Sequence, residues 1–156
     1  LNILKRASTQ TILENETIAM RATKDDAQSI SNATTTKIEY DDVDYDTHGA
    51  FNTSTNTYTV PSSGIYDIYA KMRFADLDET VGMNTSISLF LNGSVKSQIV
   101  DESAENNQTS RSMRIYDTLS LSKGDEIHIS VYHTDGSAED TKADATDNVI
   151  TIKRIK

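Results

Sequence analysis

Apolar and polar residues alternate most clearly along residues 65–74, as they do when neighbouring side chains point to opposite faces of an extended strand. One face carries Tyr66, Ile68, Ala70, Met72 and Phe74, and the other carries Asp67, Tyr69, Lys71 and Arg73. An apolar face opposite a mainly polar one is typical of a half-buried antiparallel strand. This segment is therefore predicted to be the principal core strand.

The same alternation recurs in shorter segments. It predicts further strands at residues 17–23, 35–40, 57–60, 85–91, 95–100, 111–121, 126–133 and 148–155. Asn92-Gly93 predicts a type I′ hairpin, because both central residues of that turn need positive φ. The spacing of the turns is typical of antiparallel sandwiches. We predict an all-β, antiparallel jelly-roll sandwich of about ten strands; an immunoglobulin-like sandwich with fewer strands is the alternative.

Polar segments separate the predicted strands. The acidic run at 41–46 and the stretches 101–109 and 134–146 are rich in Asp, Glu, Asn, Ser and Thr. Residues of these types favour solvated turns and loops. Each of these segments is expected to be a loop at the surface.

Residues 1–16 do not follow the alternating pattern, so we divide the chain into this segment and a domain at 17–156. The segment carries apolar side chains at Ile3, Leu4, Ile12 and Leu13, and its charged residues begin with Lys5-Arg6. It is predicted to attach the domain to a larger assembly. The alternative is a lead-in, or an additional helix or strand packed on the same domain.

Charge and composition exclude several classes of protein. The 156-residue chain has a formal net charge of −9, whereas binding to a nucleic-acid backbone requires clustered Lys and Arg. It contains no cysteine, so disulfides and thiolate chemistry play no part. No stretch approaches the roughly 20 apolar residues of a membrane-spanning helix. We expect neither a nucleic-acid partner nor a membrane span.

Catalytic chemistry is not expected. The only imidazoles are His48, His128 and His133, and no nucleophile elbow, zinc-protease helix or phosphate-binding glycine loop is present. Alternation directs His128 away from the core, and His133 lies at the end of a predicted strand. Both are interpreted as surface residues.

Carboxylates are concentrated in the 134–146 loop. Asp135, Asp140 and Asp144 are candidate ligands for calcium, which takes six to eight oxygen atoms. Their spacing does not match an EF-hand loop. A solvated acidic loop without a cofactor is the default interpretation, and calcium is the alternative.

Three motifs, in order, resemble the jelly-roll superfamily of complement C1q and tumour necrosis factor. They are GAF, YTVP and GIY within residues 49–66, ISLFLNG at 87–93 and LSLSKGDEI at 119–127. The chain is low in aromatic residues, rich in Thr and Asn and free of Cys. In this it is similar to domains of this fold found in bacteriophage head and tail fibres and in bacterial surface proteins.

The resemblance implies a homotrimer in which one sheet packs against its neighbours around a threefold axis. Tyr116, Tyr132 and Val149 are out of phase with their inward-facing neighbours, so they are predicted to lie in this interface. Some members of the superfamily bind calcium in loops near the trimer apex. The resemblance therefore adds to the case for the acidic loop as a calcium site.

Two functions follow from this resemblance. The first is a non-enzymatic structural protein that projects a trimeric head from the capsid or tail of a virion, in some cases toward the host. The alternative is a secreted or cell-surface module that binds a carbohydrate or a receptor. The expected location is thus the virion surface or otherwise extracellular. The chain lacks Trp, so the candidate platforms for a sugar are Tyr40, Tyr45, Tyr69 and Tyr132.

Overall fold

The computed structural model describes residues 17–77, 81–103 and 110–156, in which there are thirteen strands and no helix. The strands are β1 (Ala19–Thr23), β2 (Ser29–Ile30), β3 (Thr36–Lys37), β4 (Asp42–Asp46), β5 (Phe51–Asn52), β6 (Thr57–Thr59), β7 (Gly64–Arg73), β8 (Asn84–Leu91), β9 (Ser94–Glu102), β10 (Ser112–Leu121), β11 (Glu126–His133), β12 (Glu139–Asp140) and β13 (Val149–Arg154). The all-β prediction is confirmed. The count exceeds ten mainly because four of the strands contain only two residues.

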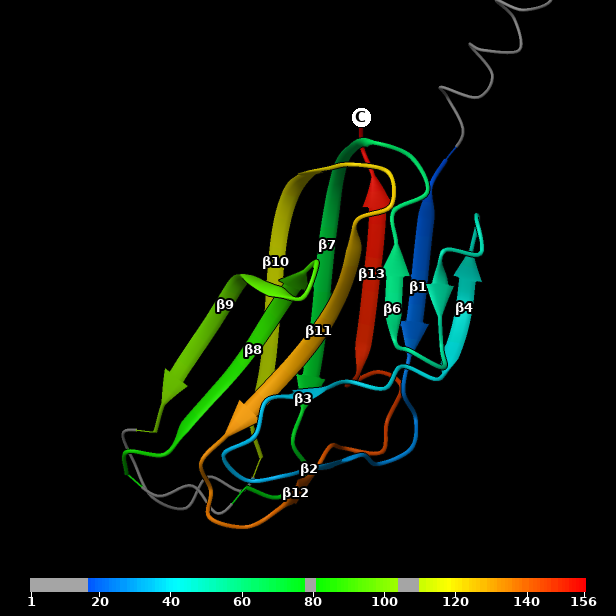
Figure 1. Ribbon diagram of the computed structural model, residues 1–156. Helices are drawn as coiled ribbons and strands as arrows, with labels where there is room; N and C mark the ends of the chain where they lie inside the picture. The colour runs from blue at the N-terminus through cyan, green and yellow to red at the C-terminus, as the bar shows by residue number, and fades with distance from the viewer. Residues whose placement is uncertain (1–16, 78–80, 104–109) are drawn as a thin grey trace, which may run out of the picture.

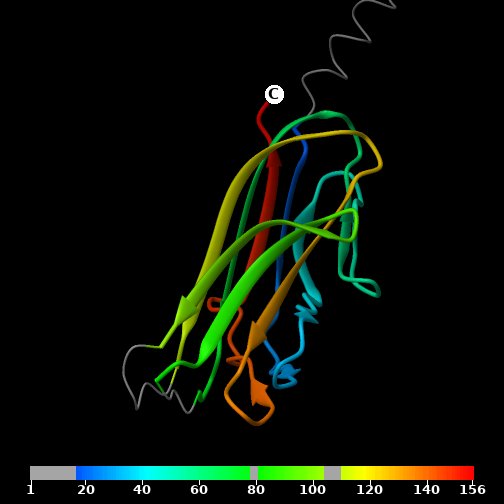
Figure 2. The same ribbon diagram turned by 60° about the vertical axis from the view of Figure 1, so that its left-hand side comes forward.

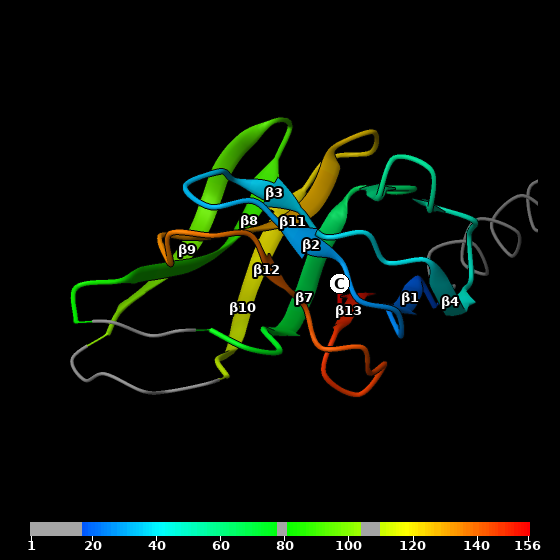
Figure 3. The ribbon, with the colours of Figure 1, turned by 90° about the horizontal axis from the view of Figure 1, so that it is seen from below.

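The strands form two antiparallel sheets that face each other (Figure 1, Figure 2). The first sheet has the order β10-β7-β13-β1-β4, and the second has the order β5-β6-β11-β8-β9 with β3 also paired to β11. Strands β2 and β12 pair with each other across one end of the sandwich, as the view from below shows (Figure 3). Many sheet neighbours are distant in sequence, which is typical of a jelly roll.

The core lies between the two sheets. The inward face of β7 is fully buried, and its partners on the second sheet include Ile87 and Leu89 of β8 and Ile127 of β11. The apolar faces of the two sheets pack against each other, as the alternation predicted, because burying apolar area is the main favourable contribution to folding. The predicted inward positions at Ile38, Tyr40, Tyr58 and Val60 are also buried.

The β8–β9 hairpin turns at Asn92 and Gly93, whose φ angles are 50° and 78°. Positive φ at both residues is what a type I′ turn requires, so this prediction is confirmed. A β-bulge between Leu89 and Phe90 shifts the register of the hairpin. The turn therefore directs β9 back along β8 as the edge strand of the second sheet.

Two acidic segments are not wholly loops. The run at 41–46 contains β4, which pairs with β1 at the edge of the first sheet, so the prediction of a loop there was wrong. Backbone hydrogen bonds of an edge strand do not require apolar side chains, and Asp44 forms an ion pair with Arg21 of β1. The 134–146 segment likewise contains the short strand β12.

Gly64 begins β7 where the chain passes close to the C-terminal residues. A Cβ atom at this position would lie 2.4 Å from both Arg154 Nε and the Lys156 carbonyl oxygen. That carbonyl accepts a 2.7 Å hydrogen bond from the Ile65 amide. The close approach explains why this position has no side chain.

We expect Gly64→Ala to lower the free energy of unfolding by about 1–3 kcal/mol, because the new methyl group forces the strand ends apart. Urea titration of the variant measures this loss. The matched control is Ser120→Ala on the exposed face of β10, which should change stability by less than about 0.5 kcal/mol. Equal stability of the two variants would contradict the prediction.

Candidate functional site

The outward face of β8, β9 and β11 forms a regular lattice of side chains. The rows across these strands are Tyr132–Ser86–Val100, Ser130–Ser88–Gln98 and His128–Phe90–Val95. The central strand thus presents two serines in succession, and Ser86 and Ser88 are only 5% and 3% exposed. Ser86 lies between two larger side chains, Tyr132 and Val100, so the surface is depressed at this position of β8.

A hollow of about 310 Å³ opens over this depression. It lies where β8 begins and β11 ends, and these two strand ends lie at the same end of the sandwich (Figure 1). Its floor is Ser86, and its walls include Tyr132, Val100, Gln98 and Thr134. This volume is at the lower end of the range of small-ligand pockets. The hollow is therefore large enough for one small polar molecule.

Hydrogen bonds fix the polar groups around the hollow. Gln98 Nε2 donates to Ser88 Oγ at 3.0 Å and to Ser86 Oγ at 3.3 Å. On the other side of the hollow, the backbone amide of Asn84 donates to Thr134 Oγ1 at 2.9 Å. These contacts orient four side chains on three different segments, so the polar groups are arranged before any ligand binds.

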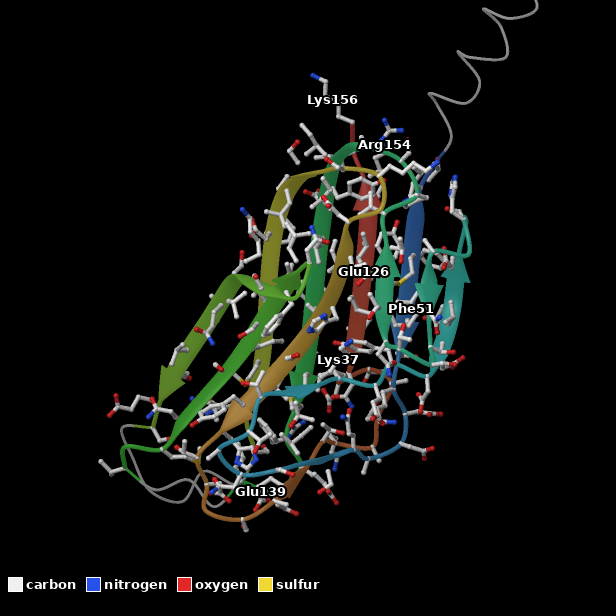
Figure 4. All side chains as sticks on the ribbon, in the orientation of Figure 1. Lys37, Phe51, Glu126, Glu139, Arg154 and Lys156 are labelled. Atoms are coloured by element: carbon white, nitrogen blue, oxygen red, sulfur yellow. The ribbon has the colours of Figure 1, made fainter. Side chains whose placement is uncertain are left out.

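On the same face, two rows away from Ser86, His128 of β11 stacks on Phe90 of β8. The ring centroids are 4.7 Å apart, and the rings are inclined by 13°. Partial burial, together with the positive charge of Lys37, lowers the pKa of His128 to about 4. Lys37 (labelled in Figure 4) is held by the Thr55 carbonyl at 3.0 Å and by Thr57 Oγ1 at 3.2 Å.

This pKa shift predicts a pH dependence of stability. The unfolded chain binds the His128 proton more tightly than the folded protein, so the contribution of neutral His128 is complete above about pH 6.5 and is lost as the pH falls toward 4. Solvent screens the partly exposed ring and reduces this effect. We expect the difference in free energy of unfolding between the wild type and His128→Gln to fall by about 1 kcal/mol, to the disadvantage of the wild type, between pH 7 and pH 5. Urea titration of both proteins at each pH measures it; an unchanged difference would contradict the prediction.

The three predicted interface residues do not share one face. Tyr116 lies on the outward face of the first sheet and is 63% exposed. Tyr132 lies on the second sheet, where it lines the hollow. Val149 has the outward phase of β13 but is only 8% exposed. The idea that one sheet presents all three was wrong, because alternation fixes the face of a residue but not its sheet.

The three residues proposed for calcium lie in different local surroundings. Asp144 Oδ1 accepts hydrogen bonds from the Thr146 amide and hydroxyl, which lower the pKa of Asp144. Asp140 lies in β12, and the backbone amide of Asp135 donates to His133 Nδ1 at 3.3 Å. Within residues 17–77, 81–103 and 110–156, no three His, Cys, Asp or Glu side chains form a group that could hold a metal ion. Calcium binding by this loop stays a prediction.

His133 is not a surface residue, contrary to the prediction. Its ring is completely buried and meets Phe74 edge-on, with 5.3 Å between ring centroids. Its Nε2 lies 3.0 Å from the Ile30 carbonyl, and its Nδ1 accepts from the Asp135 amide. The residue follows the inward phase of β11, and satisfied hydrogen bonds make its burial tolerable.

The proposed attachment residues Ile3, Leu4, Ile12 and Leu13 lie outside the described residues. In the part of the chain that the structure covers, there is no helix long and apolar enough to cross a membrane.

Sequence reasoning did not find the hollow. Ser86, Ser88 and Gln98 are ordinary polar residues of exposed strand faces, and only the register between β8 and its two neighbours brings them together. The one available signal was the pair of small residues at alternate positions of an apolar strand.

The architecture defines an antiparallel two-sheet jelly roll, and solved structures share it. The globular domain of zebrafish complement 1qA matches with a TM-score of 0.66 and 15% identity over 90% of this chain and 98% of that chain. Eiger TNF from S. frugiperda matches with a TM-score of 0.65 and 15% identity over 90% and 93%, respectively. Murine APRIL matches with a TM-score of 0.64 and 13% identity over 90% and 100%.

Sequence comparison identifies the family. The model of the C1q domain matches residues 19–147, which span most of the sandwich. The chain therefore belongs to the C1q domain family, and the resemblance to the C1q and tumour necrosis factor superfamily is confirmed. No curated protein matches the chain in sequence.

Proposed function

We propose that the protein is a non-enzymatic, trimeric binding module of the C1q type. Membership of the family supports this class of function. The observation that carries the proposal of a trimer is a pair of tyrosines on the outward face of the first sheet. Tyr116 of β10 lies directly opposite Tyr69 of β7, and Thr151 of β13 follows in the same row.

The exposed ring of Tyr116 supports this face as the contact surface. Tyr116 is 63% exposed, whereas Val149, in the outward phase of β13, is already buried within the chain. Burying aromatic area between subunits is favourable by roughly 25 cal/mol per Å². The charges that border the tyrosines are already engaged within the chain: Lys71 pairs with Asp147 at 3.4 Å, and the Asp67 carboxylate accepts a hydrogen bond from Thr118 Oγ1.

Light scattering of the full chain at micromolar concentration tests the proposal. We expect a mass three times the 17.2 kDa of the single chain. A monomeric mass would overturn the trimer.

The absence of enzymatic activity is part of the proposal. His133 is committed to two hydrogen bonds in the core, and His128 is stacked on Phe90. His48 Nδ1 lies 2.8 Å from Thr47 Oγ1, which also accepts a hydrogen bond from the Ala19 amide. These imidazoles and the hydroxyl beside His48 serve local structure, which supports binding rather than catalysis.

The larger context is a separate part of the proposal. We propose that residues 1–16 attach the domain to a larger assembly, for which a virion surface is one setting and a secreted or cell-surface protein is the other. The resemblance and the apolar residues of this segment support attachment. Deleting 1–16 should leave a folded trimer by circular dichroism and light scattering; unfolding on deletion would contradict a separate attachment role.

A further inference from the structure

We propose that the hollow over β8 binds a neutral sugar residue, with the Tyr132 ring as the platform and Ser86, Gln98 and Thr134 as hydrogen-bonding groups. This inference rests on the proposed function as a binding module and names the chemical class of one ligand. Nothing in the trimer proposal requires it, because the hollow and Tyr116 lie on different sheets.

Most of the hollow is built into the sheet, because all of its lining residues except Thr134 belong to β8, β9 and β11. Strand β8 is paired with β11 on one side and β9 on the other, and the partners of Ser86 across these strands are Tyr132 and Val100. A small side chain between two larger ones in one row leaves space that neighbouring strands cannot close. A ligand therefore meets a rigid floor with two walls, which reduces the entropy lost on binding.

The charge of the lining selects the class of ligand. Every side chain around the hollow is uncharged, in a chain in which 25% of residues are charged and the net charge is −9. A phosphate, carboxylate or ammonium group enclosed here would lose hydration without gaining an opposite charge, which is unfavourable. Neutral molecules that form many hydrogen bonds are favoured, and sugars are the common biological molecules of this kind.

The hydrogen-bonding groups match sugar hydroxyls, which both donate and accept. Thr134 Oγ1 already accepts from the Asn84 amide, so its O–H can donate to a ligand. Gln98 uses Nε2 for the two serine oxygens, which leaves Oε1 to accept. Ser86 Oγ accepts from Gln98 and keeps its own proton for donation.

The apolar walls match the C–H face of a pyranose ring. Tyr132 is half-buried at the edge of the hollow, and Val100, 59% exposed, faces it across Ser86. Amphipathic rings such as that of Tyr supply contact area with little loss of side-chain entropy. The other candidate platforms fit less well, because Tyr40 is in the core, Tyr69 adjoins Tyr116, and Tyr45 lies on the edge strand β4.

Saturation-transfer NMR on the full chain tests the site. The probes are the methyl glycosides of glucose, galactose, mannose and N-acetylglucosamine, for which we expect at least one dissociation constant on the order of 1 mM. Tyr132→Ala should weaken binding by roughly tenfold or more, and Ser86→Leu should abolish it by filling the hollow. Tyr45→Ala is the matched control on the other sheet and should retain full binding.

Folding is checked for each variant by its thermal unfolding midpoint. Absence of saturation transfer to all four glycosides overturns the inference, as does equal binding by the wild type, Tyr132→Ala and Ser86→Leu. A glycan array completes the test, because preference for sialylated over neutral glycans would contradict an uncharged ligand. If the protein is a trimer that binds no sugar, the proposed sugar site is refuted and the trimeric binding module is not. If it is a monomer that binds sugar, the proposed trimer is refuted and the sugar site is not.

Discussion

Replacing Tyr116 with aspartate is expected to convert the proposed trimer into monomers at micromolar concentration. The substitution removes an exposed aromatic ring from the outward face of the first sheet and places a new carboxylate beside Tyr69. In a threefold assembly the change occurs three times, so the repulsion and the lost apolar contact add. Light scattering should therefore give one third of the wild-type mass, and the circular dichroism spectrum should be unchanged.

The control for this experiment is Tyr132→Asp, which changes the same residue type on the outward face of the second sheet. We expect this variant to remain trimeric. If Tyr132→Asp dissociated while Tyr116→Asp stayed trimeric, the wrong sheet would have been assigned to the interface. If both variants stayed trimeric, the subunits would associate through neither tyrosine.

Replacing His133 with leucine is expected to produce the largest loss of stability among the substitutions considered. The buried ring forms two hydrogen bonds, one to the Ile30 carbonyl and one from the Asp135 amide, and it packs against Phe74. Leucine has a similar volume but removes both hydrogen bonds inside the protein. We expect a loss of about 3 kcal/mol in the free energy of unfolding, measured by urea titration at pH 7.

The matched control is His48→Leu, at a half-exposed position near β4. This change should alter stability by less than about 0.5 kcal/mol, as is usual for surface substitutions. A loss in His133→Leu no larger than in His48→Leu would show that the hydrogen bonds of His133 add nothing to stability.

The long strands and their inward faces were predictable from the sequence. In β7 and β11 the apolar residues recur at every second position, and in β10 they do so except at Asp117. This period fixes which side chains face the core. The turn at Asn92-Gly93 was predictable for a local reason, since positive φ at both residues is rare except in such pairs. Those features depend on a few neighbouring residues.

Features that depend on pairing between distant strands were not predictable in this way. The acidic strand β4 carries little apolar alternation and exists because β1 offers it a row of backbone partners. His133 was assigned to the surface because its partners, Ile30 and Phe74, are 103 and 59 residues away. The residue type suggested that His133 is exposed, whereas packing against these distant partners buries it.

The candidate sites likewise combine local properties, which the sequence predicts, with properties that depend on the pairing of distant strands. The alternating pattern alone established a strand protein with one apolar face per strand, and it marked Tyr116 and Tyr132 as outward-facing, because the direction of a side chain is a local property of an extended chain. The order of strands determined which sheet each tyrosine occupies, since that order arises from contacts across the whole chain. The hollow likewise depends on strand register. Ser86 forms its floor because the pairing of β8 with β11 and β9 places Tyr132 and Val100 on either side of it.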